Sequence, residues 1–192
     1  YSFYDTKEDI LIFGSSRGES HFIPKIIKDS TGLECFNTSL GGQGIFYSYS
    51  LLTNILVRYK PKLIIYDLSP NVILDPVALD KISVLLPYYS LNNEIQSVVA
   101  LKSPFEKIKM CSSIYPYNSL IFSIMTGLLS NNDDWKRMNG YIPLSDTINN
   151  ETNKIESKYP EADSNQIIYF TKFLDLASKS GIKVFVTVSP TY

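Results

Sequence analysis

Three short runs of consecutive apolar residues limit what this chain can fold into more than any other feature. They span residues 9–14 (DILIFG), 62–69 (KLIIYDLS) and 182–190 (IKVFVTVSP). Their apolar residues are continuous and not alternating, which is typical of parallel strands that are covered on both faces. A weaker run at residues 34–39 (ECFNTS) is a fourth candidate. The four runs predict a buried parallel β-sheet.

Segments with helical spacing separate these predicted strands. One of them ends before Pro61 and carries apolar residues at helical intervals, namely Ile45, Tyr49, Leu52, Leu56 and Tyr59. Another covers residues 163–181, where Asp163 or Ser164 can cap a helix and Gly181 can end it. Its predicted buried face consists of Ile167, Phe170, Leu174 and Ala177. Strands that alternate with helices predict right-handed crossovers and an α/β fold, a three-layer α/β/α sandwich with a flavodoxin-like parallel sheet.

One domain is expected over residues 1–192, because a chain of 192 residues with 44% hydrophobic residues suits a single core. Residues 71–165 interrupt the alternation of strands and helices. They predict an insertion that is helical up to about residue 131 and continues as a long polar loop.

Composition argues against several classes of protein. The 18 Lys and Arg residues balance 19 Asp and Glu residues, no basic stripe is visible, and nucleic-acid binding is therefore not expected. No apolar run approaches the roughly 20 residues of a membrane span. Cys35, Cys111 and the single histidine, His21, lack the spacing of metal ligands, so we expect no metal site and two ordinary buried thiols. The Gly-rich segment 41–44 lacks a following Lys-Ser/Thr, and no nucleotide cofactor is expected.

Polar clusters follow three of the predicted strands, at residues 14–17, 37–44 and 67–71. Ligands of open α/β sheets bind beyond the carboxyl ends of the strands, and all three clusters are expected there. Ser16 could be a nucleophile at a strand-to-helix turn, or it could cap the next helix. The glycines of residues 41–44 could admit a substrate, or they could form only a tight turn.

The first two clusters resemble the SGNH (GDSL) hydrolases. FGSSR matches the family's Gly-Asp-Ser block with Ser15 in place of the aspartate, so that Ser16 takes the nucleophile position. NTSLGG keeps Asn37 and Gly42 at the spacing of the second block, with Ser39 in place of the middle glycine. The resemblance covers nearly the whole chain in topology, but only these two blocks in residues.

Two further blocks of the family are weak or missing. YDLSPN lacks the glycine of the third block, and Asn71 is only a displaced candidate for its oxyanion asparagine. The Asp-x-x-His block has no counterpart up to Tyr192, and His21 follows Ser16 too closely to reach back to its hydroxyl. We therefore expect that the catalytic Asp/His pair lies beyond residue 192 or has been lost.

The resemblance implies a bacterial serine esterase or acyl hydrolase, expected in the periplasm or cell envelope, that uses no metal or organic cofactor. Ser16 would attack the ester, and the amides of Ser16 and Gly42, with Asn71, would stabilise the oxyanion. The implied substrate is a small-molecule or carbohydrate O-acyl ester. The alternative is a non-catalytic ligand- or glycan-binding domain of the same fold, which the missing histidine favours.

Three more residues are candidates for binding substrate: Arg17, Gln43 and Asp67. Arg17 could bind an acidic group of the substrate, or it could form an ion pair with Asp67 at the end of the next strand. Five tyrosines could line a sugar-binding cleft or pack beneath loops, namely Tyr66, Tyr88, Tyr89, Tyr115 and Tyr117.

Overall fold

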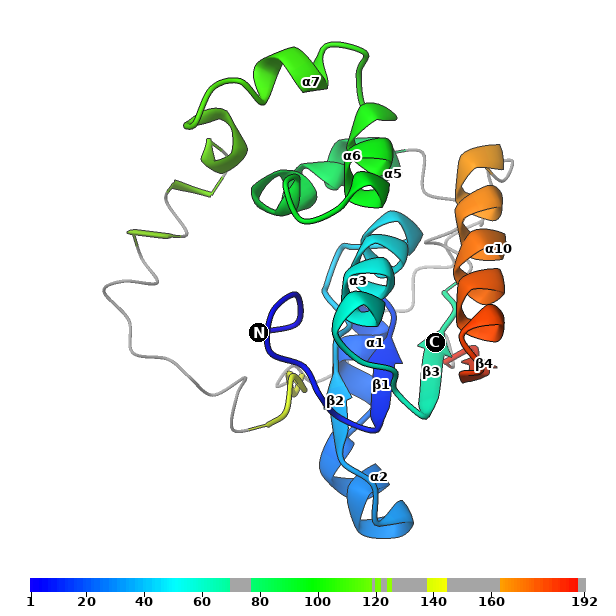
Figure 1. Ribbon diagram of the computed structural model, residues 1–192. Coiled ribbons are helices and arrows are strands. Elements are labelled where there is room, and N and C mark those ends of the chain that lie inside the picture. The colour runs from blue at the N-terminus through cyan, green and yellow to red at the C-terminus, as the bar shows by residue number, and fades with distance from the viewer. Residues whose placement is uncertain (70–76, 119, 122–123, 126–137, 145–162, 190–192) are drawn as a thin grey trace, which may run out of the picture.

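The protein is built around a parallel sheet of four strands, seen in a computed structural model that describes residues 1–69, 77–118, 120–121, 124–125, 138–144 and 163–189 (Figure 1). The strands are β1 (Ile10–Phe13), β2 (Cys35–Asn37), β3 (Leu63–Asp67) and β4 (Lys183–Thr187). Their order in the sheet is β2-β1-β3-β4, and all neighbouring pairs are parallel. The predicted α/β sandwich with a parallel sheet is confirmed. The strand order is that of the flavodoxin-like doubly wound folds.

The two faces of the sheet carry different helices. On one face, α2 (Pro24–Thr31) contributes Ile27 to a small cluster with Ile10 and Ile12 of β1. On the other face, α3 (Ile45–Arg58) and α10 (Ser164–Lys179) pack over Leu11, Phe13 and Tyr66 in the main core. Neighbouring side chains of a strand point to opposite faces, so the continuous apolar run of β1 serves both layers.

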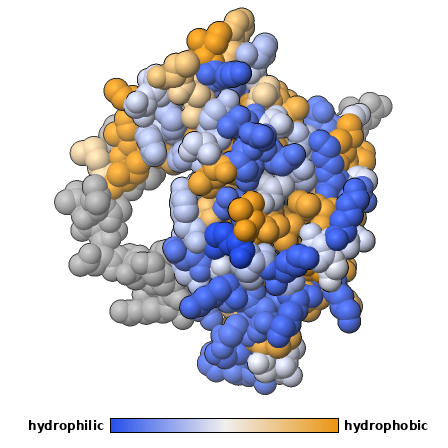
Figure 2. Space-filling model, in the orientation of Figure 1, coloured by the Kyte–Doolittle hydropathy of each residue, from blue (hydrophilic) through white to orange (hydrophobic). Residues whose placement is uncertain are grey.

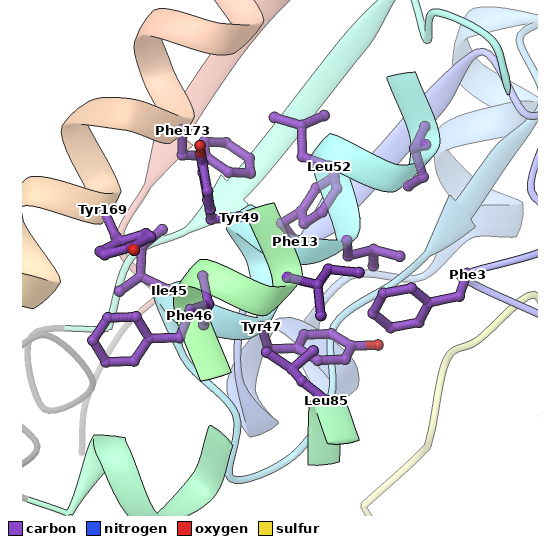
Figure 3. Packing of buried hydrophobic residues seen from close by; sticks show 14 of the residues in the cluster. Phe3, Phe13, Ile45, Phe46, Tyr47, Tyr49, Leu52, Leu85, Tyr169 and Phe173 are labelled. Carbon is purple, nitrogen blue, oxygen red and sulfur yellow. The ribbon is translucent and has the colours of Figure 1, made fainter. Parts of the chain in front are cut away.

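The main core is rich in aromatic side chains (Figure 3). Phe13 of β1 meets Phe173 of α10 edge to face, with ring centroids 5.3 Å apart. Tyr169 makes similar contacts with Phe46 at 5.3 Å and Tyr49 at 5.2 Å, both on α3. These contacts join α10 to β1 of the sheet and α10 to α3.

The structure confirms most of the predicted face of α10. Asp163 caps the helix, since its carboxylate accepts a hydrogen bond from the Asn165 N–H at 3.0 Å. Ala177 is fully buried, and Phe170 and Leu174 are partly buried against the main core. The prediction is wrong for Ile167, which is 48% exposed, because the most deeply buried side of the helix carries Tyr169 and Phe173.

Short helices fill the described part of the predicted insertion. They are α5 (Ala78–Lys81), the 3₁₀ helix η1 (Ile82–Tyr88), α6 (Asn93–Ala100), α7 (Glu106–Lys109) and the 3₁₀ helix η2 (Tyr115–Tyr117). Ile82, Leu85 and Ile95 join them to the main core. Around α7 the apolar residues Phe105, Ile108 and Ile114 stay more than 60% exposed, and Figure 2 shows hydrophobic side chains gathered over this part.

β4 is not covered on both faces as predicted. Phe185 is 67% exposed and Val186 is 43% exposed, although their partners on β3 are Ile65 and Tyr66. α2 packs against β2, so the face of β4 that carries Phe185 is left open within the described part of the chain. Val186 points to the opposite face, which α10 covers only in part.

The two cysteines lie in different environments. Cys35 is a buried thiol, and burial raises its pKa to about 12. Cys111 is exposed, so the prediction of two buried thiols is wrong for this residue.

Tyr66 packs in the core against Phe173, and Tyr88 stacks on Phe3 with ring centroids 3.9 Å apart. Among the described residues, no helix has the length and apolar character needed to cross a membrane.

Candidate functional site

The register of the sheet brings the predicted polar clusters to one edge. Phe13 pairs with Tyr66, and Asp67 pairs with Thr187, so the residues that follow β1, β3 and β4 leave the sheet together. Ser16 is the first residue of α1 (Ser16–His21) and is exposed. Ser15, and not Ser16, occupies the capping position, and the Ser15 side chain makes no capping hydrogen bond. Ser16 therefore does not cap α1, which was the alternative role considered for it from the sequence.

Two glycines let α1 lie close against the strand ends. A Cβ on Gly14 would stand 3.1 Å from the Asp67 Cβ, and a Cβ on Gly18 would stand 2.7 Å from the Ser39 hydroxyl. Side chains at either position would push the start of α1 away from the ends of β2 and β3. The backbone at Ser16 is thus positioned by close packing.

Arg17 is held by two serines that sequence reasoning missed. Its guanidinium donates to the Ser189 carbonyl oxygen at 3.1 Å and to the Ser69 hydroxyl. Ser189 in turn donates to one oxygen of Asp67, from its N–H at 3.0 Å and from its hydroxyl at 2.6 Å. Within the described residues no ion pair joins Arg17 to Asp67, so the pairing considered from the sequence is replaced by a link through Ser189.

Asp67 lies deep in this network. It is 2% exposed, and its second carboxylate oxygen is buried without a hydrogen-bond partner among the described residues. The signal for Ser69 and Ser189 was present in the sequence, because each serine stands two residues beyond the end of a strand. Nothing in the sequence showed that the two would meet.

Asn37 ties the end of β2 to α1. Its side-chain amide donates to the carbonyl oxygens of Gly18 at 2.8 Å and Phe22 at 3.2 Å, and its oxygen accepts from the Ser39 N–H at 3.1 Å. The residue is 2% exposed. All of its hydrogen-bonding groups are therefore used to join the first and second loops.

The second loop reaches the side chains of α1 at Gly41. Its N–H donates to a carboxylate oxygen of Glu19 at 3.1 Å. A Cβ on Gly41 would stand 2.9 Å from that oxygen and 3.9 Å from the Ser16 Cβ. Burial raises the pKa of the Glu19 carboxyl, and the hydrogen bond from Gly41 opposes this rise. The sequence prediction did not include Glu19.

The remaining predicted residues lie in different surroundings. Gly42 is exposed with φ at +75°, and open space surrounds the position of its absent Cβ. Gln43 is half-buried and lines a small recess of about 10 Å³ with Tyr47 and Lys81. His21 is exposed at the other end of α1 from Ser16. Asn71 lies outside the described residues.

No group of three or more His, Cys, Asp or Glu side chains could hold a metal ion in the part of the chain that the structure describes. Comparisons with protein-family models, with curated proteins and with solved structures find no match to the chain. The resemblance to SGNH hydrolases thus stays a prediction from the sequence, and a function has to be inferred from the geometry around Ser16.

Proposed function

We propose that Ser16 is the nucleophile of an acyl-transfer site and that the protein acts on esters. The observation that carries this proposal is the position of Ser16, which is exposed, begins α1, and leaves the capping position to Ser15. Its side chain makes no hydrogen bond within the described residues, so the hydroxyl is available to a ligand. The carboxyl edge of a parallel sheet is the usual place for such a ligand.

The glycine loop beside Ser16 supports the same proposal. The first N–H groups of a helix have no partner inside the helix, and the Ser16 N–H can face an oxyanion. Gly41 approaches the Ser16 Cβ, and the next residue, Gly42, has open space around it for a carbonyl group. Each oxyanion donor typically contributes about 3 kcal/mol to the transition state. Asn71 stays a predicted third donor.

In the proposed reaction the Ser16 Oγ forms a bond to the ester carbonyl carbon and gives its proton to a base. The bond to the alcohol then breaks, and the alcohol leaves with that proton. Water or an acceptor hydroxyl attacks the acyl-serine in the same way and restores Ser16. The resemblance assigns the base to an Asp-x-x-His block that residues 1–192 do not contain. His21 is a poor substitute, because about 7 Å of helix separates its backbone from that of Ser16.

Labelling with a fluorophosphonate tests the proposal, with three proteins compared: the complete product of the gene, its Ser16→Ala variant and the 192-residue chain. We expect label on the complete product, none on Ser16→Ala, and little on the 192-residue chain. Ser20→Ala, on the same helix, is the matched control and should label normally. Folded complete product that takes no label, or Ser16→Ala that still labels, would overturn the proposal.

A second candidate is a ligand-binding domain that does no chemistry. The position of His21 favours it, since the one histidine of residues 1–192 lies at the far end of α1 from Ser16. This candidate predicts that a folded, complete gene product stays unlabelled and still binds small molecules at the sheet edge.

A further inference from the structure

A groove of about 180 Å³ lies beside α1 and is lined by Glu19 of that helix. Five parts of the chain form it: the N-terminal residues, α1, β2 with the residues that follow it, α3, and residues 138–144. Its lining includes Ser2, Glu19, Phe36, Leu40, Tyr47 and Ile142. Hydrogen bonds hold these segments together, from the Ile142 N–H to the Glu19 carbonyl at 3.3 Å and from the Asn37 N–H to the Asn139 carbonyl at 2.9 Å.

Among the described residues, Glu19 is the one charged side chain that lines this groove. One oxygen of its carboxylate accepts the hydrogen bond from Gly41, and no hydrogen bond reaches the other oxygen within the described residues. Glu19 also forms no ion pair in the part of the chain that the structure describes. The groove therefore holds a half-buried negative charge with one oxygen free to accept.

Most other polar side chains of the lining are engaged within the protein, and the Tyr47 hydroxyl is hydrogen-bonded to Ser2. Thr38 donates its hydroxyl to the Ile12 carbonyl at 2.6 Å, and the amide of Asn37 is fully used. The Ser39 hydroxyl is enclosed beneath α1 without a partner among the described residues. What a ligand meets is chiefly apolar surface, from Phe36, Leu40 and Ile142, around the Glu19 carboxylate. Sites that bind small molecules commonly combine an apolar lining with a few polar groups in this way.

We infer that this groove binds a primary ammonium group carried by the substrate, with its N–H donating to Glu19 and its carbon stem lying on Phe36, Leu40 and Ile142. A cation restores the charge balance of a carboxylate that the described part of the fold leaves without a counter-ion, and charge-assisted hydrogen bonds are about twice as strong as neutral ones. The same charge disfavours acidic ligands. The groove, at about 180 Å³, admits a short amine or one amino-sugar ring.

This inference rests on the proposed function at one point: it assigns the amine to the same ester that Ser16 attacks. The position that a Cβ on Gly41 would take is 3.9 Å from the Ser16 Cβ and 2.9 Å from the Glu19 oxygen that Gly41 binds. Ser16 and Glu19 are therefore close enough for a single small molecule to contact both. The ester would then carry its amino group a few bonds away from the reacting carbonyl. Amino sugars and simple amino alcohols share this chemistry.

Titration followed by ¹⁵N–¹H NMR tests the inference, with the Gly41 and Ile142 amides as reporters. The probes form two matched pairs: n-butylammonium with 1-butanol, and glucosamine with N-acetylglucosamine. We expect at least one charged probe to bind with saturation and its neutral partner to bind at least tenfold more weakly. If n-butylammonium binds, the ligand is a simple amine, and if glucosamine binds, the ligand is an amino sugar.

Variants then separate this inference from the proposed function. Glu19→Gln should weaken binding of the charged probe at least tenfold, whereas Glu34→Gln, at the amino end of β2 and outside the groove lining, should leave it unchanged. The binding measurements do not depend on chemistry at Ser16, so a failure of fluorophosphonate labelling there would not affect this result. Neutral probes that bind as tightly as charged ones, no saturable shift with any probe, or unchanged binding by a folded Glu19→Gln variant would overturn the inference.

Discussion

The Asp67 carboxylate accepts both hydrogen bonds that Ser189 donates there, one from the N–H at 3.0 Å and one from the hydroxyl at 2.6 Å. The two residues are 122 positions apart in the sequence. Their contact joins the carboxyl ends of β3 and β4, beneath the helix that carries Ser16. Because Arg17 donates to the Ser189 carbonyl, the same contact also anchors the residue next to the proposed nucleophile.

Replacing Asp67 separates the effect of its hydrogen bonds from the effect of its charge. Asp67→Ala should lower the free energy of unfolding by about 2–3 kcal/mol, because the Ser189 donors lose a buried acceptor. Asp67→Asn should cost less than about 1 kcal/mol, since the amide oxygen can accept and one buried charge is removed. Urea denaturation measures both. If Asn proves as harmful as Ala, the charge itself is required.

Replacing Arg17 tests whether its guanidinium must donate to Ser69 and Ser189 at the same time. Arg17→Lys keeps the charge but cannot donate to both Ser69 and Ser189 in the geometry of the wild type. We expect it to lower stability by about 1–2 kcal/mol and to reduce fluorophosphonate labelling at Ser16 in the complete gene product. Arg58→Lys, which alters an arginine bonded to the N-terminal residues, should leave labelling unchanged. Normal labelling of Arg17→Lys would show that the network does not position Ser16.

Two glycines with almost the same backbone conformation provide a matched pair. Gly42 has φ at +75° and Gly32 has φ at +72°, and a Cβ added at either position would meet no described atom within 4 Å. Alanine at either position should therefore cost about 1–2 kcal/mol of stability from backbone strain alone. Only Gly42→Ala should also reduce labelling at Ser16, because Gly32 lies at the end of α2. Equal labelling in the two variants would remove Gly42 from the proposed oxyanion site.

Glu19 predicts a particular dependence of stability on pH. Burial raises its pKa in the folded protein, so the folded state binds the proton more tightly than the unfolded state does. Stability from this group is therefore full below the unfolded pKa and is lost as the pH rises through the folded pKa. Glu19→Gln removes the effect, so its stability relative to the wild type should increase from pH 4 to pH 7. Urea denaturation at both values checks the sign, and a difference that shrinks with pH would contradict it.

Local patterns in the sequence were sufficient for the strands and for two of the long helices. Three continuous apolar runs and a weaker fourth identified the strands, and spacing identified α3 and α10, because burial on a sheet and on a helix imposes different periods. The same reasoning placed Ser16 and Gly42 at one edge, since parallel strands end on the same side. It did not identify α2, and it misplaced Ile167 of α10, because Ile167 and Gln166 each begin a stripe with helical spacing.

The contacts that make the site depend on segments far apart in the chain. Arg17 and Ser189 are 172 positions apart, and Glu19 and Gly41 are 22 positions apart. No periodicity relates such pairs, because each contact exists only after the sheet aligns the strand ends and Gly14 and Gly18 let α1 approach them. The type of each element follows from neighbours along the chain, whereas the partners of a polar side chain follow from packing in three dimensions.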